Sequence, residues 1–167
     1  APVIVSKDAD MKDAVSRLAK GGFYHGGQVC VSVQRVFADA EIAKELAAAI
    51  AVEGNKMKIG DPTKADTEVG PLIKPAEVDR VHDWVTAAID GGAKLISGGE
   101  RISKSCYKPT VLFDPPADAE VSKSEIFGPV ICVYPFKDFD VAINRANSLD
   151  VSFQAAVFTK NLEYITK

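Results

Sequence analysis

The sequence predicts a layered α/β domain whose β-sheet is largely parallel. Short apolar segments of strand type alternate along the chain with amphipathic helical segments, an order typical of α/β folds. The 167 residues contain no internal repeat, low-complexity stretch or linker, and this length suits one domain with its own core. We therefore expect a single domain over residues 1–167.

The first third of the chain alternates strands with helices. Either Asp8 or Asp10 can cap the first helix, because each precedes a run of apolar residues at helical spacing. Residues 23–30 fit either an irregular segment or a last helical stretch. The predicted elements are a strand at 3–6, a helix from residue 11 that ends toward Gly21–Gly22, a strand at 31–38 and a helix at 41–52.

The rest of the chain continues the pattern after a break at Gly60-Asp61-Pro62 and a polar loop. Pro75 suits the first position of a helix that ends at Gly91–Gly92. His82 and Trp84 lie on this helix, where we expect a surface and a core position respectively. The other predicted elements are strands at 93–96, 110–113, 130–136 and 155–158, a helix at 140–147 and a helix that begins at Asn161.

Composition and charge exclude several classes of function. The formal net charge is −3 and the lysines are spread along the chain, so we expect no nucleic-acid partner. No apolar run approaches the ~18 residues of a membrane span, and the amino terminus lacks the basic leader of a signal peptide. Cys30, Cys106 and Cys132 are odd in number and widely spaced, which favours a reducing, cytoplasmic compartment over a disulfide framework. With His25 and His82 they show no zinc-ligand spacing, so we expect no metal.

The segment Gly26-Gly27-Gln28-Val29-Cys30 is the first candidate site. Two glycines let backbone N–H groups approach a ligand closely, and the cysteine lies between a helix and a strand. A thiolate there can attack a carbonyl carbon while its own N–H holds the oxyanion. The alternative is that Cys30 is a small buried hydrophobic residue, the commonest fate of a free cysteine.

Two further features involve polar side chains. In Ser124-Glu125-Ile126-Phe127-Gly128-Pro129, a carboxylate and an aromatic precede a Gly-Pro turn and a strand, so Glu125 and Phe127 can face a ligand at a sheet edge. The alternative is a helix end with a solvated acid and a core phenylalanine. His25 near Cys30 also suggests a Cys–His nucleophilic pair, although separation along the chain does not establish contact.

Taken together, five segments in order resemble the aldehyde dehydrogenase superfamily over essentially the whole chain. The Gly-Gln-x-Cys and Glu-Ile-Phe-Gly-Pro elements are the most specific, and Ala155-Ala156-Val157-Phe158-Thr159 continues the similarity. The five segments are Pro2-Val3-Ile4-Val5 with Asp8-Ala9-Asp10, Gly27-Gln28-Val29-Cys30, Ile59-Gly60-Asp61-Pro62, Val69-Gly70-Pro71-Leu72-Ile73 and Glu125-Ile126-Phe127-Gly128-Pro129-Val130.

The resemblance implies a three-layer catalytic domain and a role for each candidate residue. Cys30 would be the nucleophile that forms a thiohemiacetal and then a thioester with a small aldehyde. Glu125 would bind the ribose hydroxyls of NAD or NADP, and Phe127 would pack near the nicotinamide ring. Family members carry their general base in a Glu-Leu-Gly-Gly motif just before the position of Ala1, and their cofactor-binding and oligomerisation segments elsewhere. We therefore expect residues 1–167 to be a catalytic-domain fragment, inactive alone, of a homodimeric or homotetrameric enzyme.

Two positions depart from the family pattern. His25 stands where asparagine is usual, and residues 151–154 lack the usual glycine after an aromatic. The segment from Gly27 to Val36 is most similar to enzymes of short polar aldehydes, such as lactaldehyde-like or semialdehyde substrates. Three other hypotheses remain open: a relative that passes the thioester to coenzyme A, a thiol hydrolase using Cys30 and His25, and a non-catalytic module with a buried, unreactive Cys30.

Overall fold

The computed structural model describes residues 1–151 and 153–167 and confirms the α/β prediction. Six strands form one sheet in the order β3-β4-β5-β2-β1-β6, parallel except for the antiparallel pair of β3 and β4. The strands are β1 (Pro2–Val5), β2 (Arg35–Asp39), β3 (Lys94–Ser97), β4 (Thr110–Phe113), β5 (Val130–Phe136) and β6 (Ala156–Phe158). The helices are α1 (Met11–Phe23), the 3₁₀ segment η1 (Tyr24–Gly27), α2 (Ala43–Lys56), α3 (Pro75–Asp90), α4 (Glu120–Lys123), α5 (Phe139–Ala146) and α6 (Leu162–Ile165).

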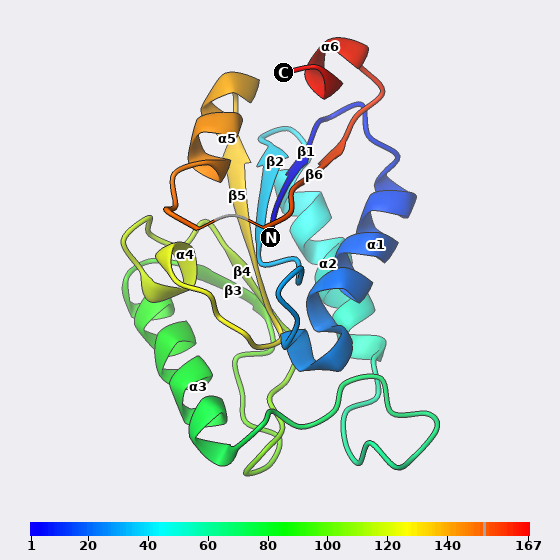
Figure 1. Ribbon diagram of the computed structural model, residues 1–167, viewed down its shortest axis with the longest axis vertical. Helices are drawn as coiled ribbons and strands as arrows, with labels where there is room; N and C mark the ends of the chain where they lie inside the picture. The colour runs from blue at the N-terminus through cyan, green and yellow to red at the C-terminus, as the bar shows by residue number, and fades with distance from the viewer. Residues whose placement is uncertain (152) are drawn as a thin grey trace.

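The sheet is the middle of three layers. Helices α1 and α2 cover one face, and α3, α4 and α5 cover the other (Figure 1). Along β5 the side chains alternate between the two cores, with Ile131 and Val133 on one side and Cys132 and Tyr134 on the other. Strands buried on both faces have nearly continuous apolar sequences, which is why β4 and β5 have the predicted bounds.

Helix ends follow the capping residues that the sequence offers. Asp10 caps α1 by accepting a hydrogen bond from the Asp13 N–H at 3.1 Å. Asp8, the other candidate, instead accepts hydrogen bonds from the Thr159 hydroxyl and the Lys160 N–H beyond β6. Pro75 is the first residue of α3, as predicted.

Helix α1 ends at Phe23, directly after the glycine pair that predicted its end. Gly22 also lies against the sheet, because a Cβ there would lie 2.5 Å from the Ile131 Cδ1 and 2.9 Å from the Val33 carbonyl oxygen. Two expectations about local structure were wrong. Strand β2 begins at Arg35, whereas residues 31–34 form a turn followed by a segment without regular secondary structure. Trp84, expected in the core, is only partly buried and stacks on the Arg80 guanidinium at 4.4 Å.

The parallel strands align their amino ends at one edge of the sheet. Pro2 pairs with Arg35 and Arg35 pairs with Cys132, so β1, β2 and β5 start side by side. The loops that lead into β2 and β5 therefore meet at this edge, and they carry both candidate site segments. The altered pattern at residues 151–154 includes residue 152, which lies outside the described residues.

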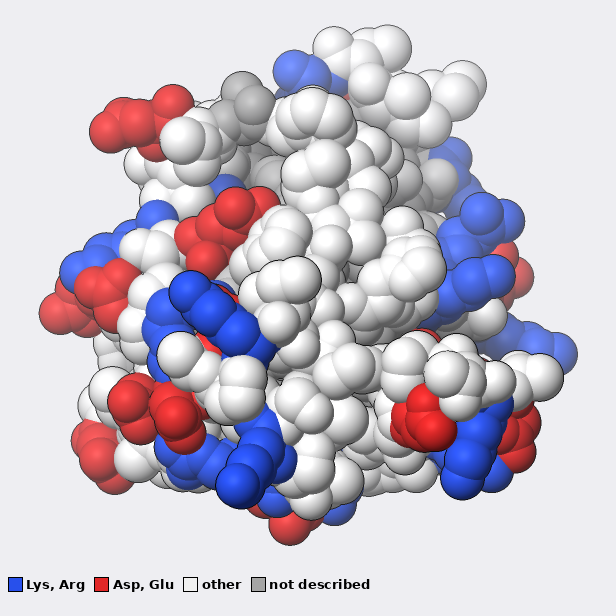
Figure 2. Space-filling view, turned by 60° about the horizontal axis from the view of Figure 1, so that its bottom comes forward, with Lys and Arg blue, Asp and Glu red and all other residues white. Residues whose placement is uncertain are grey.

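Charged side chains of both signs are mixed around the rim of the face shown in Figure 2, whose middle is mostly uncharged. None of the helices in the described residues is both long and apolar enough to cross a membrane. Within the same residues, no group of three or more His, Cys, Asp or Glu side chains is arranged to hold a metal ion.

Candidate active site

The loop that carries Cys30 starts with three consecutive residues in the left-handed backbone region. His25, Gly26 and Gly27 have φ values of 52°, 65° and 70°, which reverse the chain at the end of α1. A tight turn follows, closed by a hydrogen bond of 2.9 Å from the Ser32 N–H to the Val29 carbonyl. Cys30 lies at this turn with its side chain exposed, which contradicts the hypothesis of a buried cysteine.

The backbone at Cys30 is also free for binding. In the part of the chain that the structure describes, the Cys30 N–H donates to no backbone carbonyl. An exposed thiol beside an unused N–H donor is the arrangement that an attack on a carbonyl requires, since the oxyanion forms next to the attacked carbon.

The conformation of His25 explains why histidine replaces asparagine there. Asparagine, aspartate and histidine tolerate positive φ better than other residues with a side chain. The His25 ring is exposed and packs against Tyr24, with ring centroids 4.5 Å apart. Among the described residues no hydrogen bond connects His25 to Cys30, so the geometry offers no support for a Cys–His pair.

The second candidate loop follows α4 and leads into β5. Glu125 is exposed, Ile126 is completely buried, and Phe127 is 40% exposed. Phe127 has a φ of 48°, which a bulky residue adopts only when its surroundings impose it. Buried Ile126 thus fixes the loop, and its two neighbours, the Glu125 carboxylate and the Phe127 ring, face outward. The alternative hypothesis, in which Phe127 is a core residue, is therefore wrong.

A close backbone contact joins the two loops. A Cβ at Gly27 would lie 2.1 Å from the Gly128 carbonyl oxygen, so only glycine allows this approach. The loop that carries Cys30 and the loop that carries Glu125 and Phe127 therefore meet at the same edge of the sheet.

Two glutamines hold the surrounding segments, and sequence reasoning gave neither of them a role. The Gln28 amide donates to the Pro71 carbonyl at 3.1 Å and accepts from the Ile73 N–H at 2.8 Å, which ties the cysteine loop to the segment before α3. Gln34 makes a similar pair of bonds with the residues on either side of Glu125. Gln28 belongs to a motif quoted above, whereas Gln34 was noted only as part of the segment from Gly27 to Val36.

The other two thiols differ from Cys30. Cys132 is completely buried in β5, and burial raises the pKa of its thiol to about 12. Cys106 is also buried, with 7% of its surface exposed. Of the three cysteines, Cys30 alone has the exposure that a nucleophile needs.

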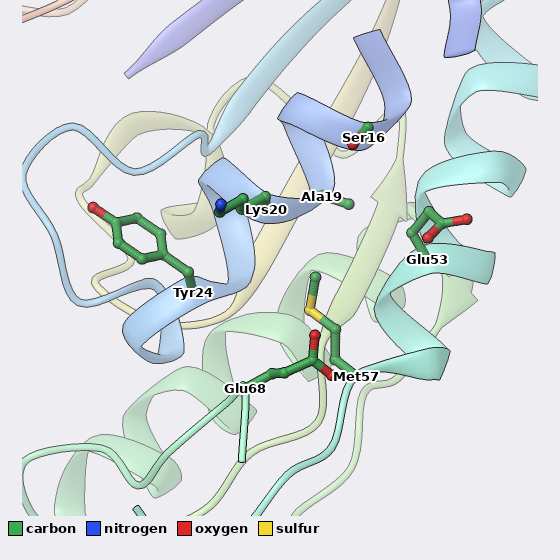
Figure 3. A pocket seen from close by; sticks show the side chains of 7 residues that line it. All are labelled: Ser16, Ala19, Lys20, Tyr24, Glu53, Met57 and Glu68. Atoms are coloured by element: carbon green, nitrogen blue, oxygen red, sulfur yellow. The ribbon is translucent and has the colours of Figure 1, made fainter. Parts of the chain in front are cut away.

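A pocket of about 390 Å³ lies between α1 and α2, away from the candidate residues. Figure 3 shows Ala19 of α1 facing Glu53 of α2 across it, whereas the Lys20 side chain extends toward Tyr24. Cys30, Glu125 and Phe127 do not contribute to its walls. The complete lining is Ser16, Ala19, Lys20, Tyr24, Glu53, Met57 and Glu68.

Comparisons with known proteins identify the family of this chain. The sequence model described as the aldehyde dehydrogenase family matches residues 1–167. The chain is 35% identical over 98% of its length to 3-sulfolactaldehyde dehydrogenase of Priestia aryabhattai, of which it covers 34%. It is 38% identical over 99% of its length to retinaldehyde dehydrogenase 3 of Rattus norvegicus, of which it covers 33%.

Solved structures give the same result. Glyceraldehyde-3-phosphate dehydrogenase of Methanocaldococcus jannaschii, solved in complex with NADP, has a TM-score of 0.93 and 36% identity over 99% of this chain, which covers 36% of that structure. The chain thus spans about a third of the length of the proteins it matches. With a family match over its entire length and a cysteine loop packed against a Glu-Ile-Phe-Gly-Pro loop, the chain belongs to the aldehyde dehydrogenase family.

Proposed function

We propose that this chain is the cysteine-bearing catalytic domain of an NAD(P)-dependent aldehyde dehydrogenase that oxidises a small aldehyde to a carboxylic acid. The observation that carries the proposal is the contact between Gly27 and Gly128. It sets an exposed thiol beside a loop that presents a carboxylate and an aromatic ring, so one substrate and one cofactor can meet there.

Cys30 supplies the covalent chemistry. Its thiolate attacks the aldehyde carbon, a C–S bond forms, and the carbonyl electrons move to the oxygen, which the Cys30 N–H can stabilise. Bound NAD⁺ or NADP⁺ supplies the hydride acceptor for the oxidation of this thiohemiacetal. Water then cleaves the resulting thioester on Cys30, releasing the acid and the free thiol.

Glu125 and Phe127 suit the nicotinamide end of the cofactor. An exposed carboxylate can accept hydrogen bonds from two neighbouring ribose hydroxyls, and a half-exposed aromatic ring can pack against a planar one. Their backbones are fixed by Ile126, which is completely buried. The residues present therefore fit the cofactor, with the cysteine loop adjacent.

The complete enzyme would extend well beyond this domain. Because the chain covers about a third of its relatives, we assign the general base, most of the dinucleotide site and the subunit contacts to the remaining two thirds. We propose a homodimer or homotetramer in the cytoplasm, where three free cysteines are compatible with the reducing conditions. The names of the sulfolactaldehyde and glyceraldehyde-3-phosphate enzymes favour a short polar aldehyde, whereas the retinaldehyde enzyme shows that family membership alone does not select it.

The experiment that tests this proposal is Glu125→Gln in the complete enzyme. Hydride transfer is expected to slow by about tenfold to a hundredfold, because a hydrogen bond to a charged group contributes about 1.5–3 kcal/mol. Cofactor affinity should change much less, since most dinucleotide contacts lie elsewhere. Single-turnover formation of reduced nicotinamide and equilibrium cofactor titration measure the two quantities.

The matched control is Asp118→Asn, which neutralises another exposed carboxylate seven positions earlier in the chain. It should leave both quantities unchanged, whereas Cys30→Ser should abolish turnover. Unchanged turnover with greatly weakened cofactor binding in Glu125→Gln would contradict the proposed roles. Repeating the assay with coenzyme A and analysing the product distinguishes the free acid from an acyl-coenzyme A product.

A further inference from the structure

The side chain of Gln34 binds the backbone on both sides of Glu125. Its Nε2 donates to the Ser124 carbonyl at 2.7 Å, and its Oε1 accepts from the Ile126 N–H at 3.1 Å. An amide side chain that binds the carbonyl of one residue and the N–H of the residue two positions later replaces the N–H and C=O of one residue in a neighbouring parallel β-strand. Glu125 is therefore held at its backbone while its carboxylate stays exposed.

Gln34 is itself fixed to the sheet. Its N–H donates to the Ala1 carbonyl at 3.3 Å, and its carbonyl accepts from the Cys132 N–H at 2.8 Å. It directly precedes β2 and follows Cys30 by four residues. Any movement of the Glu125 loop relative to the start of β2 thus has to stretch a bond made by Gln34.

Helix α3 holds the same loop from the other side. The Arg80 Nη2 donates to the Ile126 carbonyl at 2.6 Å, while its Nε pairs with Glu77 at 2.7 Å and its guanidinium stacks on Trp84. Phe127 follows with its unfavourable φ of 48°. A strained conformation of this kind persists only where neighbouring contacts outweigh its cost, and Gln34 supplies two of these contacts.

We propose that Gln34 is a positioning residue for cofactor binding: it sets the direction of Glu125 and Phe127 relative to Cys30. This inference rests on the proposed function, since it assigns Glu125 and Phe127 to the nicotinamide end of the cofactor. Without Gln34, the Ser124 carbonyl and the Ile126 N–H lose their partners, the loop loosens at Phe127, and the carboxylate no longer points in one direction.

The first test measures the contact itself in the 167-residue chain. In Gln34→Leu, which keeps the side-chain size and removes both bonds, the Ile126 amide is expected to exchange with solvent about tenfold faster or more, as followed by NMR. Gln28→Leu is the matched control: it should accelerate exchange at Ile73, whose N–H binds Gln28, and leave Ile126 unchanged. Unchanged exchange at Ile126 in Gln34→Leu would overturn the inference.

The second test measures the consequence in the complete enzyme. Gln34→Leu is expected to slow hydride transfer about tenfold while cofactor affinity stays within about threefold, because only the nicotinamide end is released. Asn55→Leu, which removes an exposed amide on α2, should change neither quantity. Faster exchange at Ile126 with unaltered hydride transfer would show that the contact is only structural and would refute the positioning role.

Gln34→Glu adds a readout that a general loss of stability would not move. A protonated carboxyl can donate to the Ser124 carbonyl and accept from the Ile126 N–H, as the amide does, whereas a carboxylate repels that carbonyl and Glu125. The rate of Gln34→Glu relative to the wild type should therefore rise as pH falls from about 8 to about 5.5, while that of Gln34→Leu stays constant. A flat ratio for Gln34→Glu would count against the inference.

The outcomes separate this inference from the proposed function. If Glu125→Gln leaves hydride transfer unchanged, the role of Glu125 fails, and the positioning role of Gln34 fails with it. Exchange at Ile126 still decides whether Gln34 fixes the loop. If Glu125→Gln slows hydride transfer and Gln34→Leu does not, the proposed function stands and only the Gln34 inference is wrong.

Discussion

Gly27→Ala tests the contact that joins the two candidate loops. An alanine Cβ would lie 2.1 Å from the Gly128 carbonyl oxygen, whereas a carbon and an oxygen approach no closer than about 3.3 Å without repulsion. The loops would have to separate by about 1 Å, because the neighbouring atoms are Gly128 and Pro129 backbone rather than the end of a flexible side chain.

The expected cost has two parts. Alanine at a φ of 70° is strained by about 1–2 kcal/mol, and forced overpacking adds about 1–3 kcal/mol. The free energy of unfolding should therefore fall by about 2–5 kcal/mol. With a denaturant dependence of about 1–3 kcal/mol per molar urea, the middle of both ranges corresponds to a fall of about 2 M in the urea midpoint of the 167-residue chain.

Gly26→Ala separates the two parts. Gly26 has nearly the same φ of 65°, but its nearest neighbours would lie 3.3 Å and 3.4 Å from a new Cβ. This variant should show the backbone strain of about 1–2 kcal/mol and little more. In the complete enzyme, Gly27→Ala should also slow hydride transfer by about a hundredfold, the effect of a misplacement of about 1 Å. Equal urea midpoints for the two variants would refute the idea that the Gly27–Gly128 approach holds the loops together.

Three further predictions follow from exposure, backbone conformation and the size of the chain. Cys30 should react with iodoacetamide well before Cys106 and Cys132, because Cys30 is exposed whereas burial raises the pKa of Cys132 to about 12. Mass spectrometry of the labelled peptides measures the rates, and equal labelling of Cys132 would contradict the nucleophile assignment. His25→Asn should keep the urea midpoint, whereas His25→Val should lose about 1–2 kcal/mol, because a β-branched residue is strained at a φ of 52°; similar midpoints for both would show that the turn relaxes. The 167-residue chain, given short aldehydes and NAD or NADP, should produce no more reduced nicotinamide than a Cys30→Ser blank. Positioning of the cofactor contributes ~7–11 kcal/mol of catalysis, and we assign most of that positioning to the rest of the enzyme. Turnover above the blank would mean that the domain binds the cofactor by itself.

The sequence alone determined the elements whose signal is local. Strands β4 and β5 are continuous apolar runs, and α3 begins at a proline suited to its first turn, so their positions could be predicted closely. Cys30, Glu125 and Phe127 were identified by resemblance, since their spacing alone left a core cysteine and a solvated acid as alternatives. Exposure of all three side chains is a property that the sequence did not contain.

Tertiary structure decided the features that depend on distant partners. Gly21 and Gly22 predicted the end of α1, but the sequence did not show that Gly22 also lies against the sheet at Ile131. Gln34 carries no chemical signal of its own, and its bonds span 90 and 92 positions to residues brought beside it by the pairing of β2 with β5. Hydrophobic periodicity reports which face of an element is buried and says nothing about which backbone group a polar side chain will reach, because that depends on how the strands are ordered in the sheet.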